Sequence, residues 1–162
     1  MHIIAAKAAG FLEALRPEFK EYIKSVLANA KILSETLKNN GFKIYSGGTD
    51  SHLMLVDLRP FGVKGNLAAE SLSRANITCN KNGIPFDSES PMITSGIRLG
   101  SQAATTRGFG LNEFKKVGEL ITKVIDGLSK NPSDNSAVEK EVRSEVIKLC
   151  SNFPIYNHLF KS

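Results

Sequence analysis

Apolar residues at helical spacing predict two helices at the start of the chain. Residues 2–15 carry them at intervals of three and four among alanines, a pattern of high helix propensity. Pro17 ends this helix, because a proline disfavours helical geometry in the residue before it, and it suits the first turn of a second helix. The second apolar stripe continues to Leu37, and Asn40-Gly41 supplies a stop. The first helix is apolar on more than one face, which suggests that the chain is a piece of a larger protein.

After Gly41 the apolar period changes from about 3.6 to about 2 residues, which predicts strands. Runs over 42–46 and 52–58 flank the turn sequence Gly-Gly-Thr-Asp, so we expect a hairpin or a strand–loop–strand unit. The other short elements predicted are a helix over 67–74 and strands over 77–80 and 95–100. Residues 81–94 have almost no periodicity, and a loop of this length in a compact domain is usually functional or disordered.

Two longer helices complete the pattern. One is predicted over 112–128, after a polar connection, and the other over 136–151, after the linker 131–135. Ser136 and Glu139 have the spacing of a capping box that opens the last helix. This order of elements predicts an α+β fold, in which helices pack on one face of a small, mostly antiparallel sheet.

The composition is that of one folded domain. A length of 162 residues, with 41% hydrophobic and 23% charged residues, is enough for a single core and argues against disorder. The 21 Lys and Arg exceed the 16 Asp and Glu, but they are scattered along the chain, and Trp is absent. Nucleic-acid binders concentrate basic residues on one face, often beside stacking aromatic residues, so we expect no nucleic-acid partner.

The cysteines and the hydropathy of the chain indicate its cellular location and the kinds of site that it is not expected to contain. Cys79 and Cys150 lie far apart in the sequence without a CxxC motif, so neither a zinc site nor a disulfide framework is indicated, and we expect no bound metal. Two reduced thiols fit a cytosolic protein. No uncharged apolar stretch approaches the roughly 18 residues of a membrane span, so we expect a cytoplasmic protein without a membrane partner.

Arg98 is the first candidate for chemistry. It lies between two apolar residues of a predicted strand, and Gly96 and Gly100 allow other groups to approach the backbone. A buried or half-buried arginine requires an anion, and its planar guanidinium binds a carboxylate through two parallel hydrogen bonds. The alternative is a strand arginine that pairs with a nearby Asp or Glu of the same protein.

Two loops contain further candidates. Residues 46–52 include Ser, Asp and His, but triad partners converge from separate elements, so we expect a turn whose side chains satisfy backbone donors. Asn82 either binds a heterocycle through its paired donor and acceptor or is an ordinary turn residue before glycine. Arg74 and Arg107 are assigned to anion contacts within the protein. Taken alone, these residues support a carboxylate-binding or interaction domain and no catalytic mechanism.

Several blocks of sequence resemble the C-terminal part of serine hydroxymethyltransferase. In chain order they are HIIAAKA at 2–8, SGGTDSHL at 46–53, RANIT at 74–78, NKN at 80–82, SPMITSGIR at 90–98 and FPIY at 153–156. The resemblance implies reversible transfer of a one-carbon unit from serine to tetrahydrofolate, which gives glycine and methylenetetrahydrofolate. It also implies pyridoxal 5'-phosphate (PLP) as the cofactor that serves as electron sink.

The resemblance assigns roles to five residues. Arg98 matches the arginine that binds the amino-acid carboxylate and thereby orients the bonds at the substrate α-carbon relative to the cofactor. Asn82 matches an asparagine that contacts the folate pterin, and Ser90, Pro91 and Met92 match the loop that lines the same pocket. Met92 departs from the commoner phenylalanine, although methionine fills apolar gaps well.

The resemblance also implies what lies outside this chain. The family's cofactor lysine and its Gly-Gly-Pro phosphate contact have no match here, so we expect no catalytic and no cofactor-binding residue in this fragment. PLP is expected in a missing large domain, with residues 1–40 as the helical connection from it. Residues 41–162 would be the C-terminal α+β small domain of a fold-type I PLP enzyme. We expect the isolated chain to be inactive and the full-length protein to form a homodimer or a larger assembly.

A second class of function remains open at this point. It is a non-catalytic amino-acid-binding or interaction module that uses Arg98 as its anion site.

Overall fold

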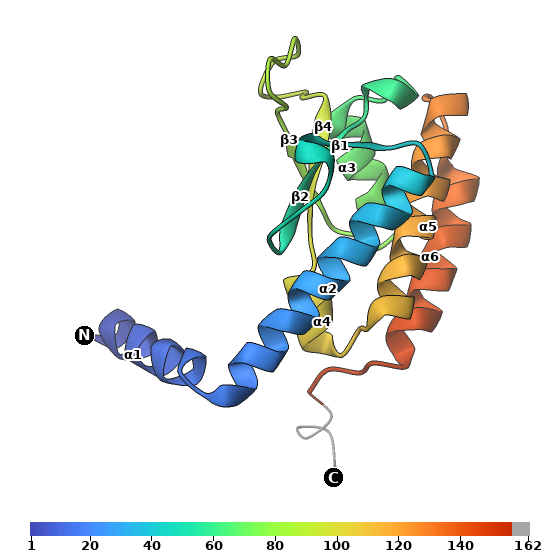
Figure 1. The fold of residues 1–162 in the computed structure, drawn as a ribbon. Helices are drawn as coiled ribbons and strands as arrows, with labels where there is room; N and C mark the ends of the chain where they lie inside the picture. The colour runs from blue at the N-terminus through green and yellow to red at the C-terminus, as the bar shows by residue number, and fades with distance from the viewer. Residues whose placement is uncertain (157–162) are drawn as a thin grey trace.

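The computed structural model describes residues 1–156 and has an α+β fold, which confirms the predicted class (Figure 1). The helices are α1 (His2–Ala14), α2 (Pro17–Asn39), α3 (Gly65–Arg74), α4 (Gln102–Arg107), α5 (Leu111–Lys130) and α6 (Ser136–Ser151). The strands are β1 (Lys43–Ile44), β2 (Leu53–Asp57), β3 (Asn80–Asn82) and β4 (Gly96–Gly100). They form one antiparallel sheet in the order β1-β2-β4-β3.

The core lies between one face of the sheet and the helices. Alternate residues of the strands point into it, among them Met54, Val56, Ile97 and Leu99, all nearly inaccessible to solvent. The C-terminal half of α2 packs on α5, and α6 lies along α5 on its other side (Figure 1). Gly118 permits the close approach of α2 and α5, because a Cβ atom there would lie 2.8 Å from Cγ2 of Thr36. No helix of the described residues covers the opposite face of the sheet (Figure 1).

The paired strands β1 and β2 confirm the strand–loop–strand unit, but the third strand is displaced from its predicted position. It lies at residues 80–82 instead of 77–80. Asn76 has a left-handed backbone, with φ of 63°, and the N–H of Ile77 bonds to Leu72 O of α3. The residues after α3 therefore close that helix and reach the sheet only at Asn80.

Two further predictions are wrong. The polar connection before residue 112 contains α4, which begins after Ser101, whose buried hydroxyl donates to Val26 O at 2.7 Å. The capping box at the start of α6 is not formed. The Ser136 N–H donates to Asp134 instead, and the Glu139 side chain turns into the protein toward α3.

The helix α1 stands away from the rest of the described chain (Figure 1). None of its residues is buried, and the exposed apolar side chains at this end are Ile3, Ile4, Phe11, Leu12 and Leu15. The following helix α2, in contrast, contributes Ala30, Leu33 and Leu37 to the core. None of the helices in residues 1–156 has the length and apolar character needed to cross a membrane.

Candidate functional site

Arg98 projects from the open face of the sheet. Its neighbours Ile97 and Leu99 are buried toward the helices, and alternation along β4 places the Arg98 side chain on the opposite face. Its cross-strand partners are Leu55 of β2 and Asn80 of β3, so side chains from both neighbouring strands share that face with the guanidinium.

The guanidinium of Arg98 is exposed and has no ion-pair partner in the part of the chain that the structure describes. The expectation of a buried or half-buried arginine is therefore wrong, because no element of residues 1–156 covers this face of β4. The alternative of an internal ion pair is also wrong for the described chain, in which no Asp or Glu bonds to Arg98 and the salt bridges engage other arginines and lysines. All of its donors are free to bind an external anion.

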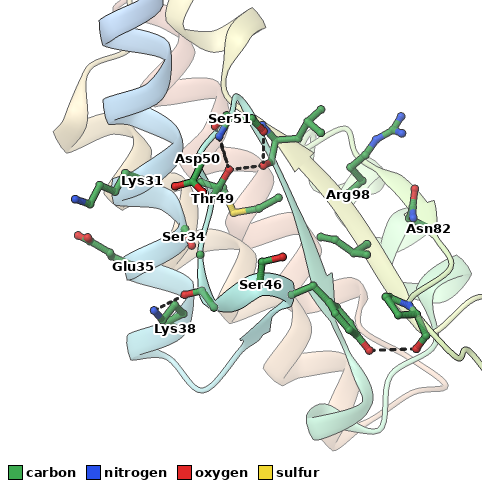
Figure 2. A pocket seen from close by; sticks show the side chains of 17 residues that line it. Lys31, Ser34, Glu35, Lys38, Ser46, Thr49, Asp50, Ser51, Asn82 and Arg98 are labelled. Atoms are coloured by element: carbon green, nitrogen blue, oxygen red, sulfur yellow. Dashed lines mark hydrogen bonds between the residues drawn. The ribbon is translucent and has the colours of Figure 1, made fainter.

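Arg98 and Asn82 line one pocket of about 790 Å³. Its other walls come from α2, the segment after β1, and β2, and Figure 2 shows Arg98 and Asn82 together on the side away from Lys31 and Glu35. Asn82 is half-buried, and its amide donates to Gly83 O at 2.7 Å. The structure thus brings together two of the five residues assigned from the resemblance.

The other three assigned residues lie outside this pocket, on the loop between β3 and β4. Ser90, Pro91 and Met92 are exposed, Met92 at 74% of its accessible surface. Lys81 donates to Met92 O at 2.7 Å, which ties this part of the loop to β3. An apolar thioether that is so exposed is available for contact with a ligand or with another part of the protein.

The loop over residues 46–52 has the structure of a turn, as predicted. The hydroxyl of Thr49 accepts a hydrogen bond from Ser51 N–H at 3.1 Å and donates to Leu53 O at 2.6 Å (Figure 2). The Ser51 hydroxyl accepts from Leu53 N–H. These side chains satisfy backbone groups and do not form a catalytic triad.

Tyr45 is a pocket residue that the sequence did not reveal. Its hydroxyl accepts a hydrogen bond from Arg59 at 3.1 Å and donates to Pro85 O at 3.4 Å. Arg59 is held by the buried carboxylate of Asp57 through Nε and Nη2. Burial raises the pKa of Asp57, but the hydrogen bonds from Arg59 outweigh it and leave the pKa below its ordinary value. This chain of contacts fixes the phenol at the wall of the pocket.

The two remaining candidate arginines have structural partners. Arg74 binds the carboxylate of Glu139, as expected for an internal anion contact. Arg107 donates to the backbone carbonyls of Phe153 and Cys150, at 2.7 and 3.1 Å, so its expected anion contact is wrong. It satisfies carbonyl groups at the end of α6.

Two lysines line the pocket that contains Arg98 and Asn82. The lysines that line the pocket, Lys31 and Lys38, are exposed on α2, and Lys38 donates to Gly47 O at 2.6 Å. A lysine that binds a cofactor covalently is instead desolvated in an enclosed site. Within residues 1–156 no three His, Cys, Asp or Glu side chains converge as metal ligands. Burial raises the pKa of the Cys79 thiol to about 11, which makes it a poor nucleophile.

Comparison with known proteins agrees with the resemblance. The family model described as serine hydroxymethyltransferase matches residues 1–121. The serine hydroxymethyltransferase of Pelagibacter ubique (strain HTCC1062) is 84% identical over 159 residues, which are 98% of this chain and 36% of that enzyme. The enzyme of the same name from Paramagnetospirillum magneticum (strain ATCC 700264 / AMB-1) is 64% identical over 156 residues, which are 96% of this chain and 36% of that protein.

The chain therefore spans about a third of the length of the curated relatives that it matches. The family model covers well over half of the chain, and the identity extends across nearly all of it. This chain belongs to the serine hydroxymethyltransferase family.

Proposed function

We propose that this chain forms the substrate-carboxylate site and part of the folate-binding surface of a PLP-dependent serine hydroxymethyltransferase. The observation that carries the proposal is the unpaired guanidinium of Arg98 in the same pocket as Asn82. In the complete protein, PLP and its lysine belong to polypeptide outside this chain, and PLP supplies the electron sink when bound. The isolated chain is then inactive. The complete protein is a cytoplasmic homodimer or a larger assembly.

Arg98 would bind and orient the amino acid. Its five N–H donors grip a carboxylate bidentately, which fixes the direction of the substrate as well as its charge. The rigid strand β4 supports this grip, because it is paired on both sides by β2 and β3. Orientation of the α-carbon decides which bond is cleaved, so this contact contributes to reaction specificity without proton transfer.

Asn82 and the loop after it would receive the folate. The amide of Asn82 offers both a donor and an acceptor to the edge of a heterocycle, and its donor is at present bonded to Gly83 O. The exposed Met92 can pack on a flat apolar surface. Both residues lie at the β3–β4 end of the sheet, beside the strand that carries Arg98.

A fusion enzyme tests this function. This chain replaces the matching 36% of the Pelagibacter ubique enzyme, to which it is 84% identical. We expect the fusion to transfer the one-carbon unit of serine to tetrahydrofolate, and the isolated chain to show no turnover. A folded fusion that binds PLP but has no such activity would overturn the proposal.

The isolated chain tests the location of the cofactor. After incubation with PLP and borohydride reduction, mass spectrometry should detect no stoichiometric attachment at a single lysine. Calorimetry of the same chain with serine, glycine and tetrahydrofolate tests the alternative, a non-catalytic binding module that uses Arg98. Binding of serine or glycine by the chain alone, combined with an inactive fusion, would favour that module.

A further inference from the structure

We propose that Asp87 is a positioning residue, which holds the loop between β3 and β4 in the shape that receives tetrahydrofolate. The inference rests on the proposed function, because it assigns a role to the loop that carries Ser90, Pro91 and Met92. Asp87 itself does not line the pocket that contains Arg98 and touches none of the assigned residues through a hydrogen bond.

The two ends of this loop are fixed to each other. The chain leaves β3 after Asn82 and enters β4 at Gly96, and these two residues are cross-strand partners. Gly96 allows this close pairing, because a Cβ atom there would lie 3.1 Å from Asn82 O. The same atom would lie 2.6 Å from Ile84 Cγ2 and 2.7 Å from Val56 O. The end of the loop is held by backbone bonds, in which Gly65 N–H and Asn66 N–H of α3 donate to Thr94 O and Ile93 O. The first half of the loop has one backbone turn, from Asp87 N–H to Ile84 O, and otherwise relies on side chains.

The carboxylate of Asp87 accepts four hydrogen bonds from the loop. Oδ2 accepts from the N–H groups of Ile84 and Ser95, at 3.1 and 2.9 Å. Oδ1 accepts from Glu89 N–H at 3.0 Å and from the Ser95 hydroxyl at 2.6 Å. One side chain thus joins the first turn of the loop, its middle and its last residue before β4.

The backbone beside Asp87 has an unfavourable conformation that its surroundings must determine. Phe86 has φ of 57°, which is costly for a bulky residue and persists only where its surroundings determine it. Its ring is fully exposed and makes no packing contact that would compensate. The turn is closed by the bond from Asp87 N–H to Ile84 O and by the bond from Ile84 N–H to the Asp87 carboxylate, and these interactions offset this cost.

Two side-chain contacts also hold the loop, on either side of Ser90. Lys64, the residue before α3, pairs with Glu89, and Lys81 of β3 donates to Met92 O. The Asp87 carboxylate also bonds Ser95, the last residue before β4, which lies three positions before Arg98. Loss of the carboxylate would therefore loosen the first turn of the loop and its link to Ser95, and so change the position of the folate-facing residues, while β4 keeps its pairing to β2.

Asp87→Asn is the variant that tests the carboxylate most specifically. It preserves the size of the side chain but replaces one oxygen by an NH₂ group, which then faces N–H donors and cannot accept from them. Asp134→Asn is the matched control, because the Asp134 carboxylate also accepts a backbone N–H, from Ser136, in the linker before α6. Ser95→Ala removes one of the four bonds and should have an intermediate effect.

Steady-state kinetics of the fusion enzyme measure the functional consequence. We expect Asp87→Asn to raise the KM for tetrahydrofolate at least fivefold and to change the KM for serine less than twofold. Ser95→Ala should raise the folate KM by a smaller factor, and Asp134→Asn should change neither constant. An unchanged folate KM in Asp87→Asn, or an equal rise in both constants, would overturn the inference.

Hydrogen exchange of the 162-residue chain separates this inference from the proposed function. The amides of Ile84, Glu89 and Ser95 should exchange at least tenfold faster in Asp87→Asn than in the unsubstituted chain, and at an unchanged rate in Asp134→Asn. If their protection does not change, Asp87 does not hold the loop, whatever the fusion does. If the unsubstituted fusion is inactive but exchange is faster in Asp87→Asn, then Asp87 holds the loop, and the proposed function is refuted together with the folate role of the loop.

Discussion

The carboxylate of Glu139 on α6 is bound by the guanidinium of Arg74 on α3 through two hydrogen bonds of 2.7 Å. The Ser71 hydroxyl donates a third bond to the same carboxylate at 2.6 Å, and Asn135 in turn donates to the Ser71 oxygen. Glu139 is almost completely buried, whereas the Arg74 side chain remains 57% exposed. This cluster is the polar connection between the last helix and the sheet-side helix α3.

Glu139→Gln should lower the free energy of unfolding by about 1–2 kcal/mol, because it removes the charge from a buried acceptor and places an NH₂ group near the donors of Arg74. Urea unfolding followed by circular dichroism measures the change. Glu141→Gln is the control, since Glu141 forms an exposed ion pair with Lys123 that should contribute less than about 1 kcal/mol. Equal effects of the two substitutions would contradict the importance of the buried cluster.

Stability should fall in acid. The hydrogen bonds from Arg74 hold the pKa of Glu139 below its ordinary value of 4.5, and bonds from the Ser95 hydroxyl and from backbone N–H groups lower that of Asp87. A carboxyl with a lowered folded-state pKa stabilises the fold above its unfolded pKa, and this contribution is lost as the pH falls. We expect the urea midpoint to decrease from about pH 5 to about pH 3, less steeply in Glu139→Gln. If the urea midpoint falls equally with pH in the unsubstituted chain and in Glu139→Gln, the lowered pKa of Glu139 does not contribute to the acid sensitivity.

Arg98→Lys in the fusion enzyme should raise the KM for serine at least about tenfold, because a lysine keeps the charge but loses the bidentate grip. Arg143→Lys is the control, at an exposed position of α6 outside the pocket, and should leave the constant unchanged. An unaltered serine KM in Arg98→Lys would remove Arg98 from the substrate site.

Gly96→Ala should destabilise the chain by about 1–3 kcal/mol, since the new methyl group would collide with Ile84 and with the carbonyl of Val56. Gly48→Ala is a fair comparison, because no atom lies within 4 Å of a Cβ there and the backbone is extended, with φ of 171°. Thermal unfolding of both variants tests this expectation. If Gly96→Ala unfolds like the unsubstituted chain, the packing of Gly96 against Ile84 and Val56 is looser than the structure shows.

The isolated chain should self-associate reversibly through α1, whose apolar side chains have no cover in residues 1–156. Sedimentation velocity across a range of concentrations measures this, and Phe11→Glu with Leu12→Glu should shift the chain toward monomer. Ile147→Glu, at an exposed position of α6, serves as the control. A monomer at every concentration would contradict the expectation.

Helices and strands whose apolar residues recur at regular spacing and face a single core were predictable from the sequence. The helices α2 and α5 have apolar stripes that face one core, and β2 and β4 alternate between a covered and an open face, so local pattern and tertiary position agree. Asn80–Asn82 was not predictable as a strand, because its polar residues pair with β4 at the edge of the sheet and bury little. The apolar Ile77 before it packs on the core without entering the sheet.

Contacts between distant segments account for the other differences. Ser136 and Glu139 have the local spacing of a capping box, but Arg74, 65 positions away from Glu139, provides stronger donors than a helix terminus does. Tyr45 acquires its place in the pocket through Arg59 and Pro85, and no spacing in the sequence indicates that contact. Arg98 could be recognised as a candidate because it lies between two apolar residues of a predicted strand. Its exposure could not be predicted, because it depends on which elements cover that face of β4.

Because Arg98 is exposed and forms no ion pair among residues 1–156, an incoming acid has only solvent and dissolved ions to displace from it. Phosphate, citrate and other buffer anions therefore compete with a substrate carboxylate for binding to this guanidinium. Measurements of ligand affinity on this chain will depend on the choice of buffer and on ionic strength, and they are best made in a zwitterionic medium of low salt.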